Sequence, residues 1–480
     1  MPSLRFTGGI ALLAAATCAC GVAFNPPGDE LPPSEPTVLT FVDPAAVPGL
    51  QVRTIYETTG TSNVHLTYPE VPGATALSDR VKADLTAEAK AFSSKAAKGK
   101  ATLPKPEINV DWQLTAVSPK ASGVRLRTGR YDGTTWLNET KTLWYDGTRV
   151  VASDLLVKDL GALARAVGAR LAGDHEVDHT AIRPSHELFD SLDFNSRGDL
   201  VVEFDDYEIG PGALGRVATA IPKKDATPLL SDFGRAAQQA VESARPTTPP
   251  ELREAPEATA PAVPGKTDCR VARCVALTFD EGPGPYTDRI LTALGSNRAT
   301  FFTTGTSAAA RPDLLRRMAA DGHLVGNHAW SHRDLTTLPD NRVYEQLSRT
   351  QDVIAQSTGS LPALMRPPYG ATNPDVARIA GELRLAVVTH DVDSGDEGDA
   401  KAADIVKRVV SGVKPGSIVL MHDLGPATPE ALPLILKELR DRGYVFVTVP
   451  ELYGTRPMQP GRTYESAVDA AVSRYGRPLP

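Results

Sequence analysis

Two different hydrophobic patterns divide this chain of 480 residues. In the first half, short segments alternate apolar and polar positions, which is typical of half-buried strands. These predicted strands cover residues 64–68, 108–112, 124–128, 142–145 and 200–204. Helical periodicity predicts helices over residues 78–97 and 155–171. The first half is therefore predicted to be an α+β domain with a twisted antiparallel sheet.

In the second half, apolar strands alternate with amphipathic helices. The predicted strands are 275–279, 300–304, 323–326, 363–366, 385–389, 417–422 and 444–449. The predicted helices include 312–320, 342–356, 374–383, 402–413 and 429–442. About seven such βα units over about 190 residues favour a parallel sheet closed into a barrel, and a doubly wound open sheet is the alternative.

Proline-rich segments separate these regions. Residues 246–266 have the composition of a semi-extended linker, and residues 25–37 that of a tether. The predicted order is a signal segment (1–24), the tether (25–37), an N-terminal α+β domain (38–245), the linker (246–266), a barrel domain (267–455) and a C-terminal tail without a motif (456–480).

The first 24 residues have the features of an export signal. Arg5 provides a short positive region, and residues 8–22 are small or apolar and uncharged, a run too short for a typical membrane span. The segment resembles a bacterial lipoprotein signal with Cys20 as the lipidated residue. Cys18, simple secretion and an uncleaved anchor are the alternatives. We expect an exported protein held at the outer face of the cell membrane by a lipid anchor, or one secreted to the cell wall.

The net charge and the two remaining cysteines give information about partners and covalent structure. The net charge is −7 and no stripe is dense in Lys or Arg, which argues against nucleic acid as a partner. In an exported protein, Cys269 and Cys274 are predicted to form a small disulfide loop. A zinc site at these two residues is disfavoured because no second cysteine pair or nearby histidine completes it.

Chemically active groups gather at the ends of the predicted barrel strands. Asp280 and Glu281 follow the first of these strands, and His328 and His332 follow the third. Histidines four residues apart can face one way on a helical turn and hold one metal ion. Two imidazoles and one carboxylate leave positions open for water and substrate, as in a catalytic metal site. Solvated turn acids and a chance histidine pair are the alternatives.

Three later strand ends add further groups. They are Arg366 in the segment Arg-Pro-Pro-Tyr-Gly370, an acidic cluster over residues 391–396, and His422 after a strongly apolar strand. A single histidine at a strand end is usually structural. A metal site across the barrel mouth favours a catalytic role for His422 instead.

In order and spacing, these segments resemble the five motifs of the NodB-type polysaccharide deacetylases, carbohydrate esterase family four. The matching segments are Thr278-Phe-Asp-Glu-Gly-Pro283, His328-x-x-x-His332, Arg366-Pro-Pro-Tyr-Gly370, Asp393-x-x-Asp396 and Leu420-x-His422. The resemblance covers about residues 270–453. It implies a distorted (β/α) barrel of the NodB type, preceded by the smaller α+β domain, and a metal-dependent hydrolase that removes acetyl groups from glycans.

The resemblance also implies a role for each residue of the motifs. The metal ligands would be Glu281, His328 and His332. The catalytic groups would be Asp280 as general base, His422 as general acid, Arg366 as the cation that orients the base, and Asp396 as a carboxylate that tunes its neighbours. Tyr369, through its backbone amide, and Leu420 would contact the substrate or its oxyanion. The metal would be divalent, with Zn²⁺ favoured over Co²⁺ or another ion.

Two positions depart from the family pattern. Glu281 stands where a second aspartate is usual, and Glu397 stands where a tryptophan usually walls the acetyl site. We expect these changes to alter the metal affinity or the substrate pocket.

Residues 194–211 resemble a module of lysozyme-sensing anti-sigma factors that also precedes the catalytic domain of some peptidoglycan deacetylases. The N-terminal domain is therefore expected to bind the cell wall or a protein partner and to hold no catalytic set. The expected substrate is the N-acetylglucosamine or N-acetylmuramic acid of peptidoglycan. The alternatives are chitin, chito-oligosaccharides or acetyl-xylan, and a glycan- or lysozyme-binding sensor that has lost turnover.

Overall fold

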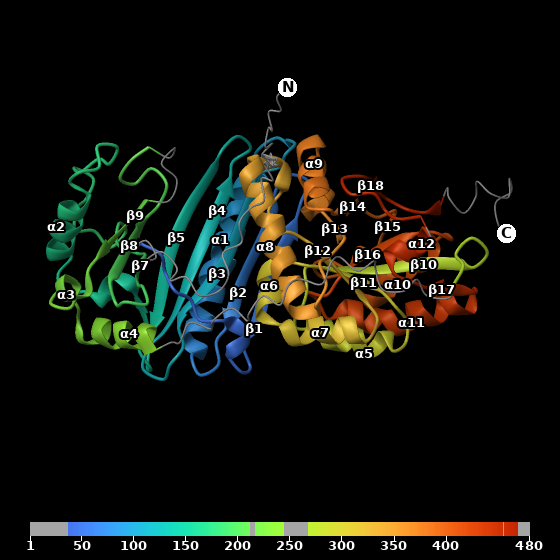
Figure 1. Cartoon of the computed structure of the whole chain (residues 1–480), viewed down its shortest axis with the longest axis horizontal. Helices are drawn as coiled ribbons and strands as arrows, with labels where there is room; N and C mark the ends of the chain where they lie inside the picture. Colours follow the sequence, from blue (N-terminus) through green and yellow to red (C-terminus); the bar gives the residue numbers. More distant parts are fainter. Residues whose placement is uncertain (1–36, 212–216, 244–266, 455, 469–480) are drawn as a thin grey trace, which may run out of the picture.

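The computed structural model describes residues 37–211, 217–243, 267–454 and 456–468. They form two parts that lie side by side along the long axis of the molecule (Figure 1). The N-terminal domain comprises the described residues up to 243, and the barrel domain those from 267 onward. The predicted signal segment, the lipidation site Cys20, nearly all of the tether and the whole of the linker lie outside the described residues.

A mixed six-stranded sheet forms the centre of the N-terminal domain. In spatial order its strands are β1 (Gln51–Thr58), β2 (Asn63–Glu70), β3 (Glu107–Ala116), β4 (Ser122–Tyr131), β5 (Trp136–Tyr145) and β6 (Val150–Ala152). The pairs are antiparallel except for β2 and β3, which run parallel. The predicted purely antiparallel sheet is thus wrong at this pair. The reason is α1 (Thr75–Ala96), a crossover helix that packs its apolar side on the sheet and returns the chain in the same direction.

A smaller layer completes the N-terminal domain. It contains the antiparallel sheet β7 (Leu192–Phe194), β8 (Leu200–Phe204) and β9 (Val217–Ile221), with α2 (Leu160–Leu171), α3 (Lys223–Ala226) and α4 (Asp232–Ser243). Its apolar core includes Trp144 of the large sheet, so the two sheets share one core. Arg125 of β4 and Glu203 of β8 also join them through a buried pair of hydrogen bonds of 2.6 and 2.9 Å.

The barrel domain is a curled, parallel half-barrel, which confirms the predicted NodB-type fold. The strands follow the order β15 (Val392–Asp393), β16 (Ile418–His422), β10 (Arg273–Asp280), β11 (Thr300–Thr303), β12 (Leu324–Asn327), β13 (Leu364–Met365), β14 (Ala386–Val388) and β18 (Thr463–Tyr464), and β17 (Tyr444–Phe446) pairs with β10. β18 belongs to the segment predicted as a tail without a motif.

Helices surround this sheet. They are α5 (Thr287–Leu294), α6 (Gly305–Ala310), α7 (Pro312–Ala320), α8 (Asp340–Thr358), α9 (Pro374–Glu382), α10 (Ala402–Gly412), α11 (Ala427–Asp441) and α12 (Val449–Leu452). The strands are almost entirely buried because helices cover them, which explains their continuous apolar runs in the sequence.

The two domains are in direct contact. Ala310 of α6 belongs to the same apolar cluster as the core of the six-stranded sheet. The side chain of Asn109 on β3 donates a hydrogen bond of 2.6 Å to the carbonyl of Ser331, and Glu107 accepts one of 3.0 Å from the amide of Asp334. All of these polar groups belong to buried residues, so β3 is fixed against the loop that follows β12.

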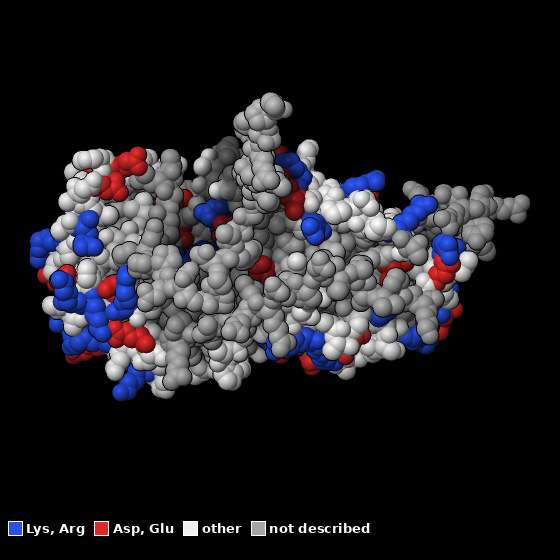
Figure 2. All heavy atoms as spheres, viewed as in Figure 1, with Lys and Arg blue, Asp and Glu red and all other residues white. Residues whose placement is uncertain are grey.

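The outer surface carries charges of both signs. On the face shown in Figure 2, basic and acidic side chains lie interspersed over both domains. No helix in the described part of the chain is long and apolar enough to cross a membrane.

The Arg125–Glu203 pair gives a stability prediction. Arg125→Met should lower the free energy of unfolding by about 3–5 kcal/mol, because it leaves the Glu203 carboxylate buried without its guanidinium. Arg53→Met removes a half-exposed partner of Glu70 and should cost no more than about 1 kcal/mol. Urea unfolding of both variants, followed by circular dichroism, measures the difference. Equal losses would contradict the structural role of the buried pair.

Candidate functional site

The carboxyl ends of the central barrel strands bring the predicted groups together. β10 runs parallel to β16, and Asp280 lies opposite His422 at their ends. On its other side Asp280 lies opposite Phe302 of β11. Since parallel strands end at one edge of the sheet, the first and last sequence motifs meet there, although Asp280 and His422 are 142 positions apart in the sequence (422 − 280).

Asp280 is held by a buried cation. The Nη1 atom of Arg366 donates hydrogen bonds of 2.8 Å to Asp280 Oδ1 and 2.6 Å to the hydroxyl of Thr278. Nη2 of the same guanidinium donates to the carbonyl of Thr389 at 2.8 Å. Asp280 and Arg366 are both buried. Arg366 therefore fixes Oδ1 of the carboxylate, while Oδ2 is not bound by the guanidinium.

His328 and His332 lie on a loop after β12. The predicted helical turn is wrong, because the loop has left-handed backbone at Ala329 and His332, with φ of 61° and 60°. His328 nevertheless points toward the site: its Nδ1 bonds to the carbonyl of Arg366 at 2.7 Å, and its Nε2 lies 3.8 Å from Asp280 Oδ2. The loop thus positions both imidazoles without a helix.

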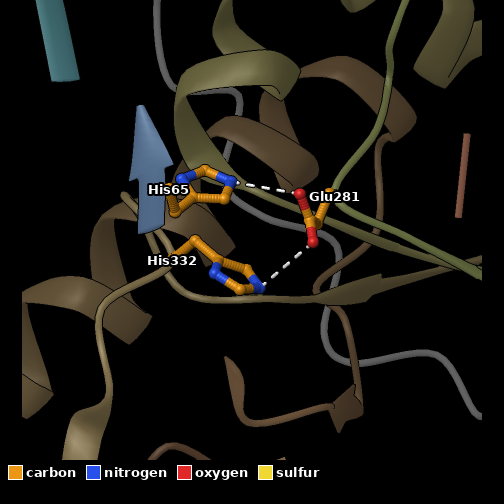
Figure 3. A group of neighbouring side chains, drawn as sticks. All are labelled: His65, Glu281 and His332. Carbon is orange, nitrogen blue, oxygen red and sulfur yellow. Dashed lines mark hydrogen bonds and ion pairs between the residues drawn. The ribbon is translucent and has the colours of Figure 1, made fainter. Parts of the chain in front are cut away.

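Glu281 lies between two histidines, one from each domain (Figure 3). Its Oε1 is 3.5 Å from Nε2 of His332, and its Oε2 is 3.1 Å from Nε2 of His65. Glu281 itself has a left-handed φ of 74°, a conformation that costs a non-glycine residue about 1–3 kcal/mol and is concentrated at functional sites. His65 lies on β2, so the N-terminal domain places a side chain beside the predicted site residues, which the sequence motifs did not predict.

These three side chains have the chemistry of a metal site. The ligand atoms of His65, Glu281 and His332 all lie within 4.8 Å of one another. Burial lowers the pKa of His328, and burial together with His65 and His328 lowers that of His332 well below its usual value. Neutral imidazoles and a carboxylate are the ligands that Zn²⁺ takes in catalytic sites. A divalent metal therefore fits this donor set.

His422 is paired with a buried carboxylate. Its Nδ1 lies 2.8 Å from Asp396 Oδ1, while its backbone amide donates to Oδ2 at the same distance. Burial alone would lower the pKa of His422, but Asp396 outweighs it and raises the pKa well above its usual value. Burial would likewise raise the pKa of Asp396, but His422 holds it below its usual value. Both groups are therefore charged at neutral pH.

A cavity of about 250 Å³ opens above these groups. The barrel domain lines it with Asp280, His328, His332, Asp334, Arg366, Pro367, Tyr369, Gly370, Ala371, Thr389, His390, Asp393, Glu397, Leu420 and His422. The N-terminal domain adds Tyr56, Thr58, Asn63, Leu103, Pro104 and Lys105. Every predicted catalytic or substrate residue except the buried Asp396 thus lines one cavity, and the predicted metal ligand Glu281 lies at its base beside His332.

Tyr369 has a special backbone at this cavity. It lies in a short 3-10 turn, Pro368–Gly370, with a left-handed φ of 59°. Its ring contacts that of His332 edge-on, with centroids 4.7 Å apart. The predicted use of its amide as a donor to the substrate stays a prediction.

No sequence motif indicates the residues that the N-terminal domain contributes to the cavity. His65 is 216 positions before Glu281, and Tyr56 is 341 positions before Glu397, to which its hydroxyl donates a hydrogen bond of 3.2 Å. His65 belongs to a strand that the sequence pattern predicts, and Tyr56 belongs to β1, which has one buried residue and is not among the predicted strands. Only the packing of the two domains brings them to the cavity.

The barrel domain is similar to known proteins. The family model described as polysaccharide deacetylase matches residues 267–388. A chitooligosaccharide deacetylase of Bradyrhizobium sp. is 35% identical over 204 residues, 39% of this chain and 93% of that protein. The peptidoglycan-N-acetylglucosamine deacetylase PgdA of Listeria monocytogenes is 38% identical over 213 residues, 44% of this chain and 45% of that protein, so the chain spans about half of its length.

A further relative matches more of the chain. The peptidoglycan-N-acetylmuramic acid deacetylase PdaC of Bacillus subtilis is 29% identical over 368 residues, 73% of this chain and 76% of that protein. The chain also matches a solved structure of peptidoglycan deacetylase PdaC from Bacillus subtilis, at 38% identity and a TM-score of 0.37. The match covers 38% of this chain and 91% of the chain in that structure.

The His422–Asp396 pair gives a prediction for proton binding. His422 should keep its second proton at pH 7 and lose it only as the pH rises through its raised pKa. Asp396→Asn removes the carboxylate charge and should move that loss about 1–3 pH units lower. Nuclear magnetic resonance of histidine-labelled, metal-free protein measures both titrations. Asp375→Asn, at an exposed position, is the control. An unchanged His422 titration in Asp396→Asn would contradict the pairing.

Proposed function

Because the chain belongs to the polysaccharide deacetylase family, we propose that it hydrolyses N-acetyl groups on amino sugars of a glycan and releases acetate. The observation that carries this proposal is one cavity that holds a fixed carboxylate, a charged histidine and a set of metal donors. Acetyl transfer to water needs a base, an acid and a group that stabilises the oxyanion.

A divalent metal fits the donors at the base of the cavity. Glu281 and His332 would hold it, together with His328 as the family resemblance implies. When bound, such an ion supplies a Lewis acid for the acetyl carbonyl and lowers the pKa of a bound water toward neutrality. Among the possible ions, Zn²⁺ suits a site of imidazoles and one carboxylate best.

Asp280 is the proposed general base. Arg366 fixes Oδ1 and leaves Oδ2 on the side of His328, so the second carboxylate oxygen is held beside the metal donors. This oxygen would accept a proton from the attacking water. A rigid, buried ion pair keeps the carboxylate in one orientation and avoids reorganisation during the reaction.

His422 is the proposed general acid. Asp396 holds its Nδ1, so Nε2 is the nitrogen that remains to serve the cavity. An amide nitrogen is a poor leaving group unless it is protonated, and the raised pKa of His422 keeps a proton available for it at neutral pH. Acetate and a free sugar amine would then leave.

The proposed substrate is peptidoglycan, at its N-acetylglucosamine or N-acetylmuramic acid. Support comes from the relatives in Listeria and Bacillus, whose names give these two sugars. Chito-oligosaccharide is the second candidate, since the Bradyrhizobium relative is matched over most of its length. Both substrates carry the same N-acetyl group, so the reaction proposed for Asp280 and His422 is common to them.

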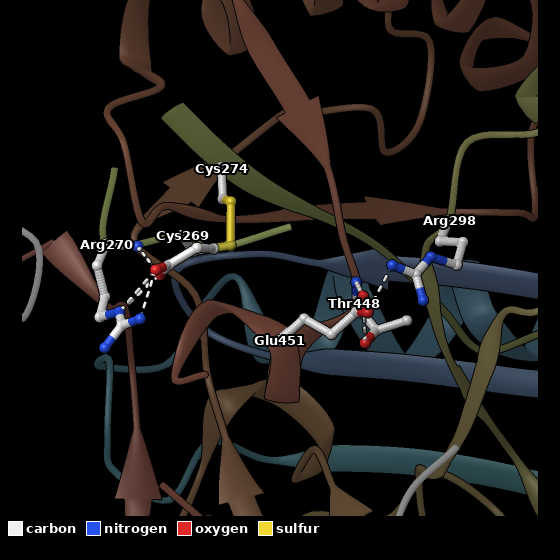
Figure 4. The surroundings of a disulfide bond; sticks show 7 residues. Cys269, Arg270, Cys274, Arg298, Thr448 and Glu451 are labelled. Carbon is white, nitrogen blue, oxygen red and sulfur yellow. Dashed lines mark hydrogen bonds and ion pairs between the residues drawn. A yellow bond between two sulfur atoms is a disulfide. The ribbon is translucent and has the colours of Figure 1, made fainter. Parts of the chain in front are cut away.

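We further propose that the protein works outside the cytoplasm, anchored through Cys20 or secreted. The support from the described residues is the disulfide between Cys269 and Cys274, at the start of β10 (Figure 4). Such bonds persist in oxidising compartments and are rare in the cytosol. A cell-wall substrate lies in the same compartment.

The role of Asp280 can be tested by one isosteric change. Asp280→Asn should lower the rate of acetate release by about 10²–10⁴-fold, because the amide cannot accept the proton of water. Zn²⁺ binding should remain, since Asp280 is not among the metal donors. The exposed Asp321→Asn is the matched control and should keep full activity. Near-normal acetate release from Asp280→Asn would contradict the assignment.

The substrate can be tested on isolated cell walls and on chito-oligosaccharides. We expect acetate release, and mass spectrometry of wall fragments should show that each deacetylated sugar has lost C2H2O, because a hydrogen replaces its acetyl group. The sugar that loses mass identifies N-acetylglucosamine or N-acetylmuramic acid. No acetate from either glycan in the presence of Zn²⁺ would contradict the proposed enzyme and favour a binding or sensing role.

A further inference from the structure

The two residues that depart from the family pattern, Glu281 and Glu397, both contact the β1–β2 hairpin of the N-terminal domain. Glu281 contacts His65 of β2, and Glu397 accepts a hydrogen bond from Tyr56 of β1. Tyr56 and His65 lie directly opposite each other in the β1–β2 hairpin. The two unusual acids of the barrel domain are therefore matched by one cross-strand pair of the other domain.

His65 is placed as a metal ligand would be. Its ring lies beside that of His332, with centroids 4.3 Å apart and an angle of 19° between the planes, so one of the two rings turns when both Nε2 atoms bind the same ion. Its Nε2 points at Glu281 Oε2 from 3.1 Å, while His332 Nε2 is 3.5 Å from Oε1. Ligand atoms around a tetrahedral zinc with bonds of 2.0–2.1 Å lie about 3.3 Å apart. The two nitrogen–oxygen distances lie on either side of that value, and all ligand atoms of the group lie within 4.8 Å of one another.

The buried carboxylate of Glu281 also favours a bound cation. His65, Glu281 and His332 are all at most 2% exposed. In the described ranges, the ion pairs of Glu281 are with these two histidines, and no lysine or arginine pairs with it. A buried carboxylate is costly unless a positive charge or several hydrogen bonds compensate it. A divalent ion shared by the two imidazoles would supply this charge.

We propose that His65 is a ligand of the metal ion, so that the metal centre is built from both domains. The inference rests on the metal dependence of the proposed function. It also accounts for Glu281: the extra methylene, relative to aspartate, lets one carboxylate reach between His332 of the barrel domain and His65 of the N-terminal domain. The N-terminal domain is then part of the active site and not only a binding accessory.

Metal binding by the full chain tests this without any measurement of activity. His65→Ala should weaken Zn²⁺ binding at least about tenfold in competition with a chromogenic chelator, since even indirect partners of metal ligands are worth about 10–100-fold. X-ray absorption at the zinc edge should count one imidazole fewer than in the unmodified chain. His175→Ala, at an exposed histidine of the N-terminal domain, should change neither value.

An unchanged imidazole count in His65→Ala would overturn the proposal, even with weaker binding, because His65 would then only orient Glu281. His65→Gln keeps the size of the side chain and should show the same loss of one imidazole if the alanine variant folds poorly. Failure of the unmodified chain to bind Zn²⁺ would overturn both the proposed metal dependence and the ligand role. Normal Zn²⁺ binding without acetate release would overturn the proposed function alone.

A second variant tests the reach of Glu281. Glu281→Asp shortens the side chain and should weaken Zn²⁺ binding in the unmodified background. In the His65→Ala background the same change should have a smaller effect, because the carboxylate no longer has to reach the second domain. Equal effects in the two backgrounds would overturn the link between Glu281 and His65, since residues that act independently give additive changes.

Discussion

The buried carboxylates at the end of β10 determine how the rest of the site is arranged. Asp280 and Glu281 are both buried, and each needs a compensating partner because burying an unpaired charge costs free energy. Arg366 compensates Asp280 through a short hydrogen bond. Glu281 has histidines at both of its oxygens instead. This difference in partners supports the two different roles proposed for these adjacent acids, Asp280 as the base and Glu281 as a metal donor.

The same constraint explains why the domains meet where they do. Glu281 contacts His65 of the N-terminal domain. Strand β3 is fixed to the loop of His328 and His332, because Asn109 donates a buried hydrogen bond to that loop and Glu107 accepts one from it. The N-terminal domain therefore closes one side of the cavity. A barrel domain separated from it would keep the proposed base, the proposed acid and the proposed donors Glu281, His328 and His332, but it would lack His65 and the wall formed by Tyr56.

The barrel domain was more predictable from the sequence than the domain contact. Its buried parallel strands are continuous apolar runs in the sequence, and acids or histidines follow several of these runs directly. The ends of the runs therefore indicate both where the strands end and which residues form the site. The loop of His328 and His332 was predicted as a helical turn because spacing alone cannot reveal left-handed residues such as Ala329. Strand β1 was missed because Val52 is its one buried residue. The role of His65 depends on packing between distant segments, which no local pattern encodes.

The most direct test of this account is the position of the metal in a crystal of the full chain. An anomalous difference map collected at the zinc absorption edge locates Zn²⁺ independently of any assumption about its ligands. The account predicts one strong peak between Glu281, His332 and His65, within bonding distance of all three. A peak bound only by residues of the barrel domain, with His65 turned away, would contradict it.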